Sequence, residues 1–247
     1  MKTLLGSASI LDRTLECPAS NLLPQTAPLH PNAKAAGDFG TAVHAVLEGV
    51  EPDPQYKEEL KDLPIGATVA PYAMGKEDRE LAMVWRGEDG KCEVLGNGLG
   101  RDYGVLGPKD VTGTGDVVLT GYKAVEVWDY KTGKTIPDPA ESAQLKHLAM
   151  MAVKALRPNA EVVVAGFQRV RIDGRKKQAD RWVVKDEVTV LTRVDLDLHE
   201  RRLKRALVEA EKAKAAIDSG ETPEVKEGKY CFFCPARLEC PAKKGMR

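Results

Sequence analysis

The chain has 247 residues, of which 43% are hydrophobic, and its 37 Lys and Arg residues equal its 37 Asp and Glu residues. This length suffices for one α/β core, so we expect a single domain over residues 1–247. A balanced charge excludes a protein that coats polyanions through its overall field, so any nucleic-acid surface must be local.

Two further counts exclude other classes. No run reaches the roughly 20 apolar residues that a membrane helix needs. The five cysteines are an odd number, which fits a metal site plus a spare thiol better than a secreted disulfide framework. We therefore expect a cytoplasmic protein with no membrane contact.

The first half of the chain changes from helical to β character. Residues 38–50 have apolar side chains at helical spacing, and residues 76–85 are a second helical candidate. Residues 116–120 and 123–131 are two β-rich runs joined by a turn, which predicts a hairpin.

The second half is predicted to alternate helices and strands. In chain order we expect an amphipathic helix at 140–156, a buried strand at 161–170, a polar turn and short strand at 171–184, a strand at 188–194 and a charged helix at 197–218. The order helix, hairpin, helix, strand predicts an α/β/α arrangement around a mixed sheet, followed by a cysteine-bearing tail.

Asp129 and Lys131 form the motif that points most directly to chemistry. They lie two residues apart on a predicted strand, so they share one face, and Asp116 begins the neighbouring strand. Carboxylates suit Mg²⁺ or Mn²⁺, and such a metal polarises phosphate and acidifies bound water. The ammonium group can orient that water or offset developing negative charge. On this motif alone, an exposed ion pair at a strand end is an equal alternative.

A second motif, G-x-x-x-H-x-x-x-E, is formed by Gly40, His44 and Glu48. The histidine and the glutamate are four residues apart, so they lie on one helix face and can reach a common centre. A lone helical histidine is more often structural, so this motif supports a metal site only in combination with the D-x-K motif and Asp116.

This motif is followed in the chain by G-x-x-D at Gly113–Asp116, by D-x-K at Asp129–Lys131 and by a helix with Gln144. The motifs in this order resemble those of the RecB-like PD-(D/E)XK nucleases. The resemblance implies a restriction-endonuclease-like α/β/α core with a mixed sheet. It also implies site roles: metal ligands His44, Asp116, Asp129 and the Tyr130 carbonyl, the catalytic lysine Lys131, and further catalytic candidates Glu48 and Gln144. Where that family often has Q-x-x-x-Y, this chain has Leu148, so the resemblance does not define how Gln144 contacts DNA.

The cysteines suggest a second metal site. Cys231 and Cys234 form C-x2-C, a spacing that places two thiolates on one soft metal, and Cys240 follows. Cys17, after the sequence SASIL, resembles the early cysteine of the iron–sulfur RecB-like nucleases, including those of CRISPR adaptation. The resemblance implies a [4Fe-4S] cluster on these four cysteines, in a subregion formed by Cys17 and the 226–247 tail, with Zn²⁺ as the alternative occupant. Cys92 is predicted to be a buried small hydrophobe.

Local positive charge is the remaining signal for DNA. Basic residues gather in the tail and in a second cluster: Lys226, Lys229, Arg237, Lys243, Lys244 and Arg247, then Arg169, Arg171, Arg175, Lys176 and Lys177. Either cluster can follow a phosphate backbone, although each is more often a solvated face. Phe232 and Phe233 are predicted to pack over the cysteine cluster rather than stack on bases.

Together these features predict a divalent-metal-dependent DNA exonuclease that acts at DNA ends in recombination, repair or CRISPR adaptation. Its expected substrate is DNA that is single-stranded or has a free end. By resemblance, its partners include a recombination or CRISPR-adaptation protein, or further copies in a homo-oligomer. The alternative is a catalytically silent iron–sulfur or zinc protein of the same fold that binds DNA or acts as a scaffold.

Overall fold

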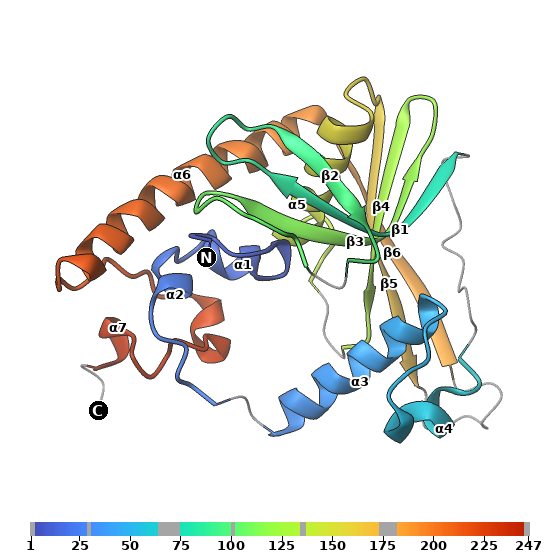
Figure 1. Ribbon diagram of the computed structural model, residues 1–247, viewed down its shortest axis with the longest axis horizontal. Helices are drawn as coiled ribbons and strands as arrows, with labels where there is room; N and C mark the ends of the chain where they lie inside the picture. The colour runs from blue at the N-terminus through green and yellow to red at the C-terminus, as the bar shows by residue number, and fades with distance from the viewer. Residues whose placement is uncertain are drawn as a thin grey trace.

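The computed structural model describes residues 3–28, 31–63, 75–99, 102–133, 137–172 and 182–244 (Figure 1). Within them, a six-stranded sheet has the order β2-β1-β3-β4-β5-β6. The strands are β1 (Lys76–Trp85), β2 (Cys92–Asn97), β3 (Val111–Thr120), β4 (Ala124–Lys131), β5 (Val162–Ile172) and β6 (Trp182–Leu191). Only β4 and β5 pair in parallel among these strands, so the mixed sheet and the α/β fold are confirmed.

Three longer helices and several short ones surround the sheet (Figure 1). The longer helices are α3 (Pro31–Leu47), α5 (Ala143–Leu156) and α6 (Arg193–Asp218). The short elements are η1 (Ala8–Ile10), α1 (Leu11–Thr14), α2 (Ala19–Leu22), η2 (Pro54–Tyr56), α4 (Lys57–Leu60), η4 (Lys229–Phe233) and α7 (Pro241–Lys244). No helix among the described residues is both long and apolar enough to cross a membrane.

The two faces of the sheet carry separate hydrophobic clusters because side chains alternate along each strand. On β3, Val118 packs with α5 and α6 in the larger cluster, whereas its neighbour Val117 packs in the cluster that includes Val43 of α3. On β4, Val127 and Trp128 divide in the same way. Helices therefore cover both faces, as the three-layer prediction requires.

The predicted hairpin is confirmed, and the following elements place its second strand at the centre of the sheet. Val117 of β3 pairs with Trp128 of β4. Because β5 runs parallel to β4, the chain must cross over between them, and α5 forms this crossover. Helix α5 starts at a Ser142 cap, and the Asp12 carboxylate accepts a 3.0 Å hydrogen bond from the Ala143 amide.

The predicted helix at 76–85 is wrong, because these residues form strand β1. Its second half, Leu81–Trp85, is buried, and the strand lies between β3 and β2. A continuous apolar run buried on both faces cannot be told from a buried helix by periodicity alone.

The order of the last strand and helix is confirmed, but their boundary is shifted. Strand β6 ends at Leu191 rather than Val194, and Thr192 begins α6 with a reciprocal capping box to Asp195. Most of the predicted polar turn, residues 173–181, lies outside the described residues.

Candidate metal centre and thiol pocket

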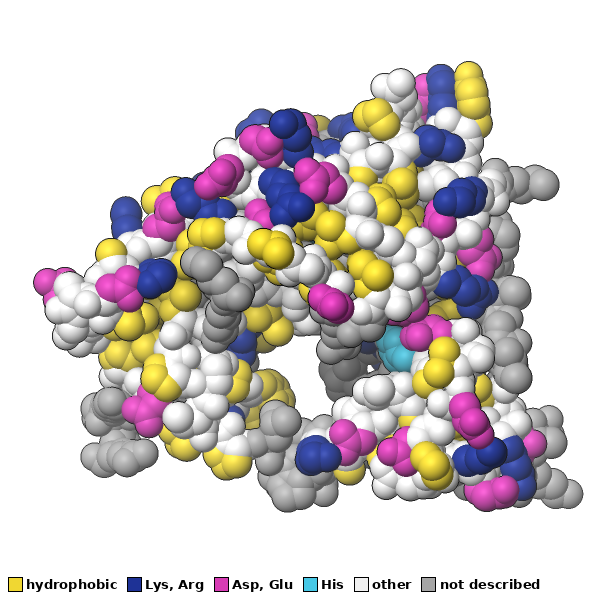
Figure 2. All heavy atoms as spheres, in the orientation of Figure 1, with side chains coloured by type: hydrophobic (Ala, Val, Ile, Leu, Met, Phe, Trp, Pro, Cys, Tyr) yellow, Lys and Arg dark blue, Asp and Glu magenta, His cyan; other side chains and the backbone are white. Residues whose placement is uncertain are grey.

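An open cleft of about 680 Å³ lies where α3 approaches the ends of β3 and β4. Figure 2 shows a hollow in this region, with a histidine side chain in cyan at its edge. The cleft is lined by every residue that the sequence marked as a metal or catalytic candidate: His44, Glu48, Asp116, Asp129, Tyr130, Lys131 and Gln144. Residues far apart in the sequence thus share one cavity.

Lys131, Asp129 and Gln144 form a closed set of polar contacts on one wall of the cleft. The ammonium nitrogen of Lys131 lies 2.5 Å from Asp129 Oδ2 and donates to Gln144 Oε1 at 3.1 Å. The Gln144 amide in turn donates to Asp129 Oδ1 at 2.6 Å. Both side chains of the D-x-K motif are therefore held in position by one residue of α5.

Asp116 and His44 both contact the backbone of Tyr130. The Tyr130 amide donates a hydrogen bond to Asp116 Oδ2. His44 Nδ1 is 3.6 Å from the same oxygen, and its Nε2 is 3.2 Å from the Tyr130 carbonyl oxygen. The implied ligand set is therefore gathered around one segment of β4.

The electrostatics of this set favour a bound cation. Burial raises the pKa of Asp116 well above its ordinary value, and the nearby Asp129 carboxylate raises it further. The Tyr130 amide and the Lys131 ammonium group lower this pKa, but by less. A cation beside a carboxylate favours its ionised form. Carboxylate and carbonyl oxygens with one imidazole are ligands that suit Mg²⁺ or Mn²⁺, so the residues fit such a metal.

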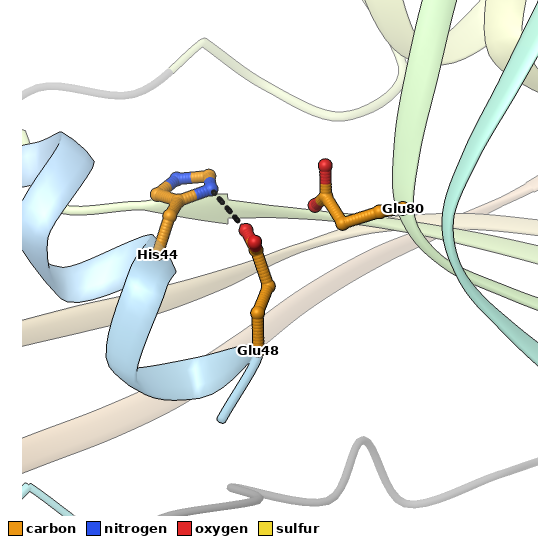
Figure 3. Close-up of side chains that lie close together, drawn as sticks. All are labelled: His44, Glu48 and Glu80. Carbon is orange, nitrogen blue, oxygen red and sulfur yellow. Dashed lines mark ion pairs between the residues drawn. The ribbon is translucent and has the colours of Figure 1, made fainter. Parts of the chain in front are cut away.

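Glu80 is a member of the site that the sequence reasoning missed. His44, Glu48 and Glu80 each offer a ligand atom, and these atoms all lie within 4.8 Å of one another. Figure 3 shows the Glu48 and Glu80 carboxylates turned toward the same space, and His44 Nδ1 lies 4.0 Å from Glu48 Oε1. The misassigned helix at 76–85 concealed Glu80. An available signal was an acidic residue directly before a buried apolar run.

The surroundings of Glu80 disfavour a negative charge in the absence of a cation. Its pKa is raised to about 8, first by burial and then by the Asp116 and Glu48 carboxylates. The register of β1 and β3 pairs Arg79 with Val117 and Leu81 with Gly115, so Glu80 lies opposite Asp116. Its φ of 48° is rare for a residue with a side chain, and such strained positions cluster at functional sites.

The glycines of the two upstream motifs allow close packing around the cleft. A Cβ atom on Gly113 would lie 2.7 Å from Leu148 of α5 and 2.8 Å from Ala8. A Cβ atom on Gly40 would lie 3.0 Å from the Thr132 hydroxyl. Glycine at these positions thus lets helices α3 and α5 approach the site strands.

The four predicted cluster cysteines line one pocket between the N-terminal segment and the tail. Cys17 follows α1, whereas Cys231, Cys234 and Cys240 come from the tail around η4. Figure 1 shows the red tail beside the blue α2, and the Ala27 amide donates a 2.9 Å hydrogen bond to the Pro235 carbonyl. The structure therefore joins the tail to the N-terminal segment.

The thiols of this pocket are not drawn together as a compact set. Within the described part of the chain, no three of these sulfur atoms all lie within 4.8 Å of one another. Burial raises the pKa of Cys17, while the Lys226 and Ser20 amides that face its sulfur lower it. Thiolates are ligands of iron–sulfur clusters and of Zn²⁺, so the residues of the pocket fit either group.

The structure gives different outcomes for the aromatic pair of the tail and for Cys92 of β2. The prediction that Phe232 and Phe233 pack over the cysteines is wrong, because their exposed fractions are 78% and 77% and they contact each other edge to face. Cys92 is half-buried and packs against the larger core, and burial raises its pKa to about 12, as expected for a small hydrophobe.

The two basic clusters are only partly described. Lys226 forms an ion pair with Glu209, and Arg169 lies 3.9 Å from Glu187. The Arg237 guanidinium donates to the Pro28 carbonyl. The described part of the chain does not include residues 175–177 and 247 or the side chains of residues 243 and 244.

The sequence places this geometry in a known class. Residues 6–241 match the model of the PD-(D/E)XK nuclease superfamily. The chain therefore belongs to this superfamily, whose members are generally metal-dependent nucleases that act on DNA. The structure is similar to the one described as "Crystal structure of SSO0001", with a TM-score of 0.36 and 16% identity, covering 87% of this chain and 72% of that chain. No curated protein matches the chain significantly.

Proposed function

We propose that the chain is a RecB-like, divalent-metal-dependent exonuclease that hydrolyses phosphodiester bonds at DNA ends, within a single domain over residues 1–247. Its pathway would be recombination, repair or CRISPR adaptation. The observation that supports it best is the convergence of His44, Asp116, Asp129 and Lys131 on one cleft. A decayed nuclease commonly loses one of these groups, so an intact set favours the enzyme over a silent scaffold.

The residues have distinct chemical roles in this proposal. A bound Mg²⁺ or Mn²⁺ would polarise the scissile phosphate and supply activated water. Asp116, Asp129, His44 and the Tyr130 carbonyl would hold it. Lys131, fixed by its contacts to Asp129 and Gln144, would place its ammonium group where negative charge develops on the phosphate.

We assign the thiol pocket to a [4Fe-4S] cluster, in a subregion formed by Cys17 and the 226–247 tail. The pattern of one early cysteine and a late C-x2-C followed by Cys240, with all four in one pocket, supports this assignment, and Zn²⁺ is the alternative occupant. The role of the cluster would be structural, since it would connect the N-terminal segment to the tail. A metal clip of this kind can stabilise a chain by up to about 5 kcal/mol in the chain-entropy model.

The proposed substrate is DNA with a free end, in single-stranded form. The exposed Phe232 and Phe233 support this choice, because aromatic side chains stack on unpaired bases without sequence preference. Stacking contributes about 1–3 kcal/mol per base in such complexes.

End-labelled single-stranded and double-stranded DNA would test the activity directly. Anaerobically purified protein is incubated with Mn²⁺, Mg²⁺ or EDTA, alongside Asp129→Ala and the control Asp186→Ala on β6. We expect metal-dependent release of label that Asp129→Ala abolishes and the control retains. Folded, brown protein that cleaves neither substrate would contradict the proposal and favour the scaffold alternative.

A further inference from the structure

A row of basic side chains crosses three neighbouring strands beside the metal centre. Lys131 of β4 pairs with Arg169 of β5, and Arg169 pairs in turn with Lys185 of β6. Paired residues of neighbouring strands point to the same face of a sheet, so the three side chains share the face that carries Asp129. Neighbouring strands lie about 4.8 Å apart, so this cationic row extends about 10 Å from Lys131 to Lys185.

Side-chain contacts agree with this shared face. The Lys131 ammonium group lies 5.3 Å from the centre of the Phe167 ring, and Phe167 is two residues before Arg169 on β5. Arg169 Nη1 lies 3.9 Å from Oε1 of Glu187, and Glu187 is the residue of β6 that pairs with Phe167. The guanidinium of Arg169 therefore lies on the same side of the sheet as the D-x-K motif.

Beyond Lys131, the row carries more positive charge than its surroundings offset. Within the described part of the chain, Arg169 and Lys185 share one carboxylate, that of Glu187, at 3.9 and 3.2 Å. Arg171 lies two residues further along the same face of β5 and is exposed. Three cations thus share one acid, and this part of the sheet would attract a further anion.

Arg169 is the member of the row that most needs an acceptor. Its Nε atom is buried from solvent and has no hydrogen-bond partner among the described residues, and its Nη1 atom is too far from Glu187 for a hydrogen bond. The side chain keeps 19% of its surface exposed, so a ligand can reach it. Lysines commonly protect the edge strand of a sheet, but β5 is internal, so this role does not explain Arg169.

We propose that Arg169 and Lys185 bind the phosphates next to the one that is hydrolysed, so that the DNA strand leaves the metal centre across β5 and β6. This inference rests on the proposed DNA nuclease and adds the path of its substrate. A guanidinium presents a planar fork of donors that matches two oxygens of one phosphate. The row can hold about two or three phosphates, at about 3.4 Å of rise per nucleotide in a stacked strand. Contacts to phosphates position a strand without reading its sequence.

The salt dependence of DNA binding tests the row without reference to cleavage. A labelled single-stranded oligonucleotide is titrated with full-length protein at several salt concentrations, with Ca²⁺ in place of the catalytic metal. Each phosphate contact contributes about 0.7 to the slope of log affinity against log salt for single strands. Arg169→Gln and Lys185→Gln are each expected to lower this slope by about 0.7. Arg205→Gln, at an exposed position on α6, is the control and should retain the wild-type slope.

A neutral phosphate identifies the contact of Arg169. One phosphate at a time is replaced by an uncharged methylphosphonate along a series of oligonucleotides. We expect one position to weaken binding by the wild type about tenfold and to leave binding by Arg169→Gln unchanged. Arg169→Lys should restore the salt slope but not the full affinity, because lysine keeps the charge and loses the fork.

The cleavage assay separates the outcomes. Equal salt slopes for the wild type, Arg169→Gln and Lys185→Gln would overturn the inference even if DNA is degraded. The side chain of Lys185 is 65% exposed, so the test does not depend on the folding of the Arg169 variant. Slopes that depend on both residues in a protein that cleaves no DNA with Mn²⁺ would support the inference and count against the proposed nuclease.

Discussion

The Gln144 side-chain amide donates a 2.6 Å hydrogen bond to Asp129, and this contact joins the first turn of α5 to the end of β4. The same glutamine accepts from Lys131 at 3.1 Å. A residue that contacts both members of the D-x-K motif can define the position of each. The departure from Q-x-x-x-Y at Leu148 leaves this contact intact, because Leu148 is buried in the main core.

Replacing Gln144 by alanine should therefore slow turnover more than it weakens DNA binding. We expect kcat to fall about 10–100-fold, the range typical of residues that orient metal ligands, with KM changed less than threefold. Steady-state cleavage of end-labelled DNA measures both constants. Gln55→Ala, at an exposed position, is the control. A rise in KM alone would show that Gln144 binds DNA instead of positioning Asp129 and Lys131.

Removal of single cysteines should show that the pocket cysteines bind iron and that Cys92 does not. Cys17→Ala and Cys240→Ala are expected to lose the brown colour and most of the bound iron, and to lower the melting temperature. Cys92→Ala should keep the iron, because Cys92 packs against the core and not in the pocket. Iron, zinc and sulfide analysis with visible spectra provide the measurement. Colourless wild-type protein with one zinc per chain would refute the cluster.

Buried histidines should make the protein sensitive to acid. The His147 and His199 rings lie 5.6 Å apart between α5 and α6, and burial lowers the pKa of His147 to about 4. Between pH 6.5 and about 4 the unfolded chain binds a proton at His147 that the folded chain does not. The free energy of unfolding should therefore fall by about 3 kcal/mol as the pH decreases through this window.

The variant His147→Leu isolates this effect from the carboxylates. The pKa values of Asp116 and Glu80 are raised in the folded chain, so protonation of these carboxyl groups increases the free energy of unfolding as the pH falls. Both groups are present in the wild type and in the variant, so their effect cancels in the comparison. Urea denaturation of metal-free protein at several pH values gives the comparison. We expect a smaller loss of unfolding free energy in the variant. Parallel pH profiles for the two proteins would show that His147 does not titrate in this window.

Two glycines should respond oppositely to alanine. At Gly113 the added methyl group would lie 2.7 Å from Leu148 and 2.8 Å from Ala8, so Gly113→Ala should cost about 1–3 kcal/mol of unfolding free energy. At Gly37, in α3, a Cβ atom meets nothing within 4 Å, and alanine should stabilise by about 0.5–1 kcal/mol. Thermal and urea unfolding measure both. Equal effects at the two positions would contradict the packing argument.

Loss of the exposed aromatic pair should weaken binding to single-stranded DNA. We expect Phe232→Ser with Phe233→Ser to raise Kd for a fluorescently labelled oligonucleotide at least tenfold, since stacking contributes about 1–3 kcal/mol per base. Tyr122→Ser is the matched control, because Tyr122 is also exposed but lies in the β3–β4 turn. Fluorescence anisotropy with Ca²⁺ in place of the catalytic metal gives the affinity. Unchanged binding would assign the pair to another partner.

The parts of the fold that depend on local pattern could be predicted from the sequence. The β3–β4 hairpin and α5 follow from strand alternation, a turn and a helical stripe, which lie close together in the chain. Strand β1 could not be assigned in this way, because its helix-forming residues Glu80–Met83 take strand geometry only through pairing with β2 and β3. Tertiary pairing outweighed local preference there.

The same contrast applies to the site. His44, Asp116, Asp129 and Lys131 belong to motifs with recognisable spacing, and the structure places them in one cleft. Glu80 belongs to no spacing pattern. Its approach to Glu48 depends on the register of β1 against β3 and on an unusual backbone angle, neither of which can be read from neighbouring residues.

The thiol pocket also constrains the order of events during synthesis. Cys17 leaves the ribosome long before Cys231, Cys234 and Cys240, and the whole sheet is made between them. The pocket is therefore completed only after the strands and α6 are available to bring its two parts together. A chain that stops before the tail would present only Cys17 of the four pocket thiols, so the complete set marks a chain whose translation has passed the sheet and reached the tail.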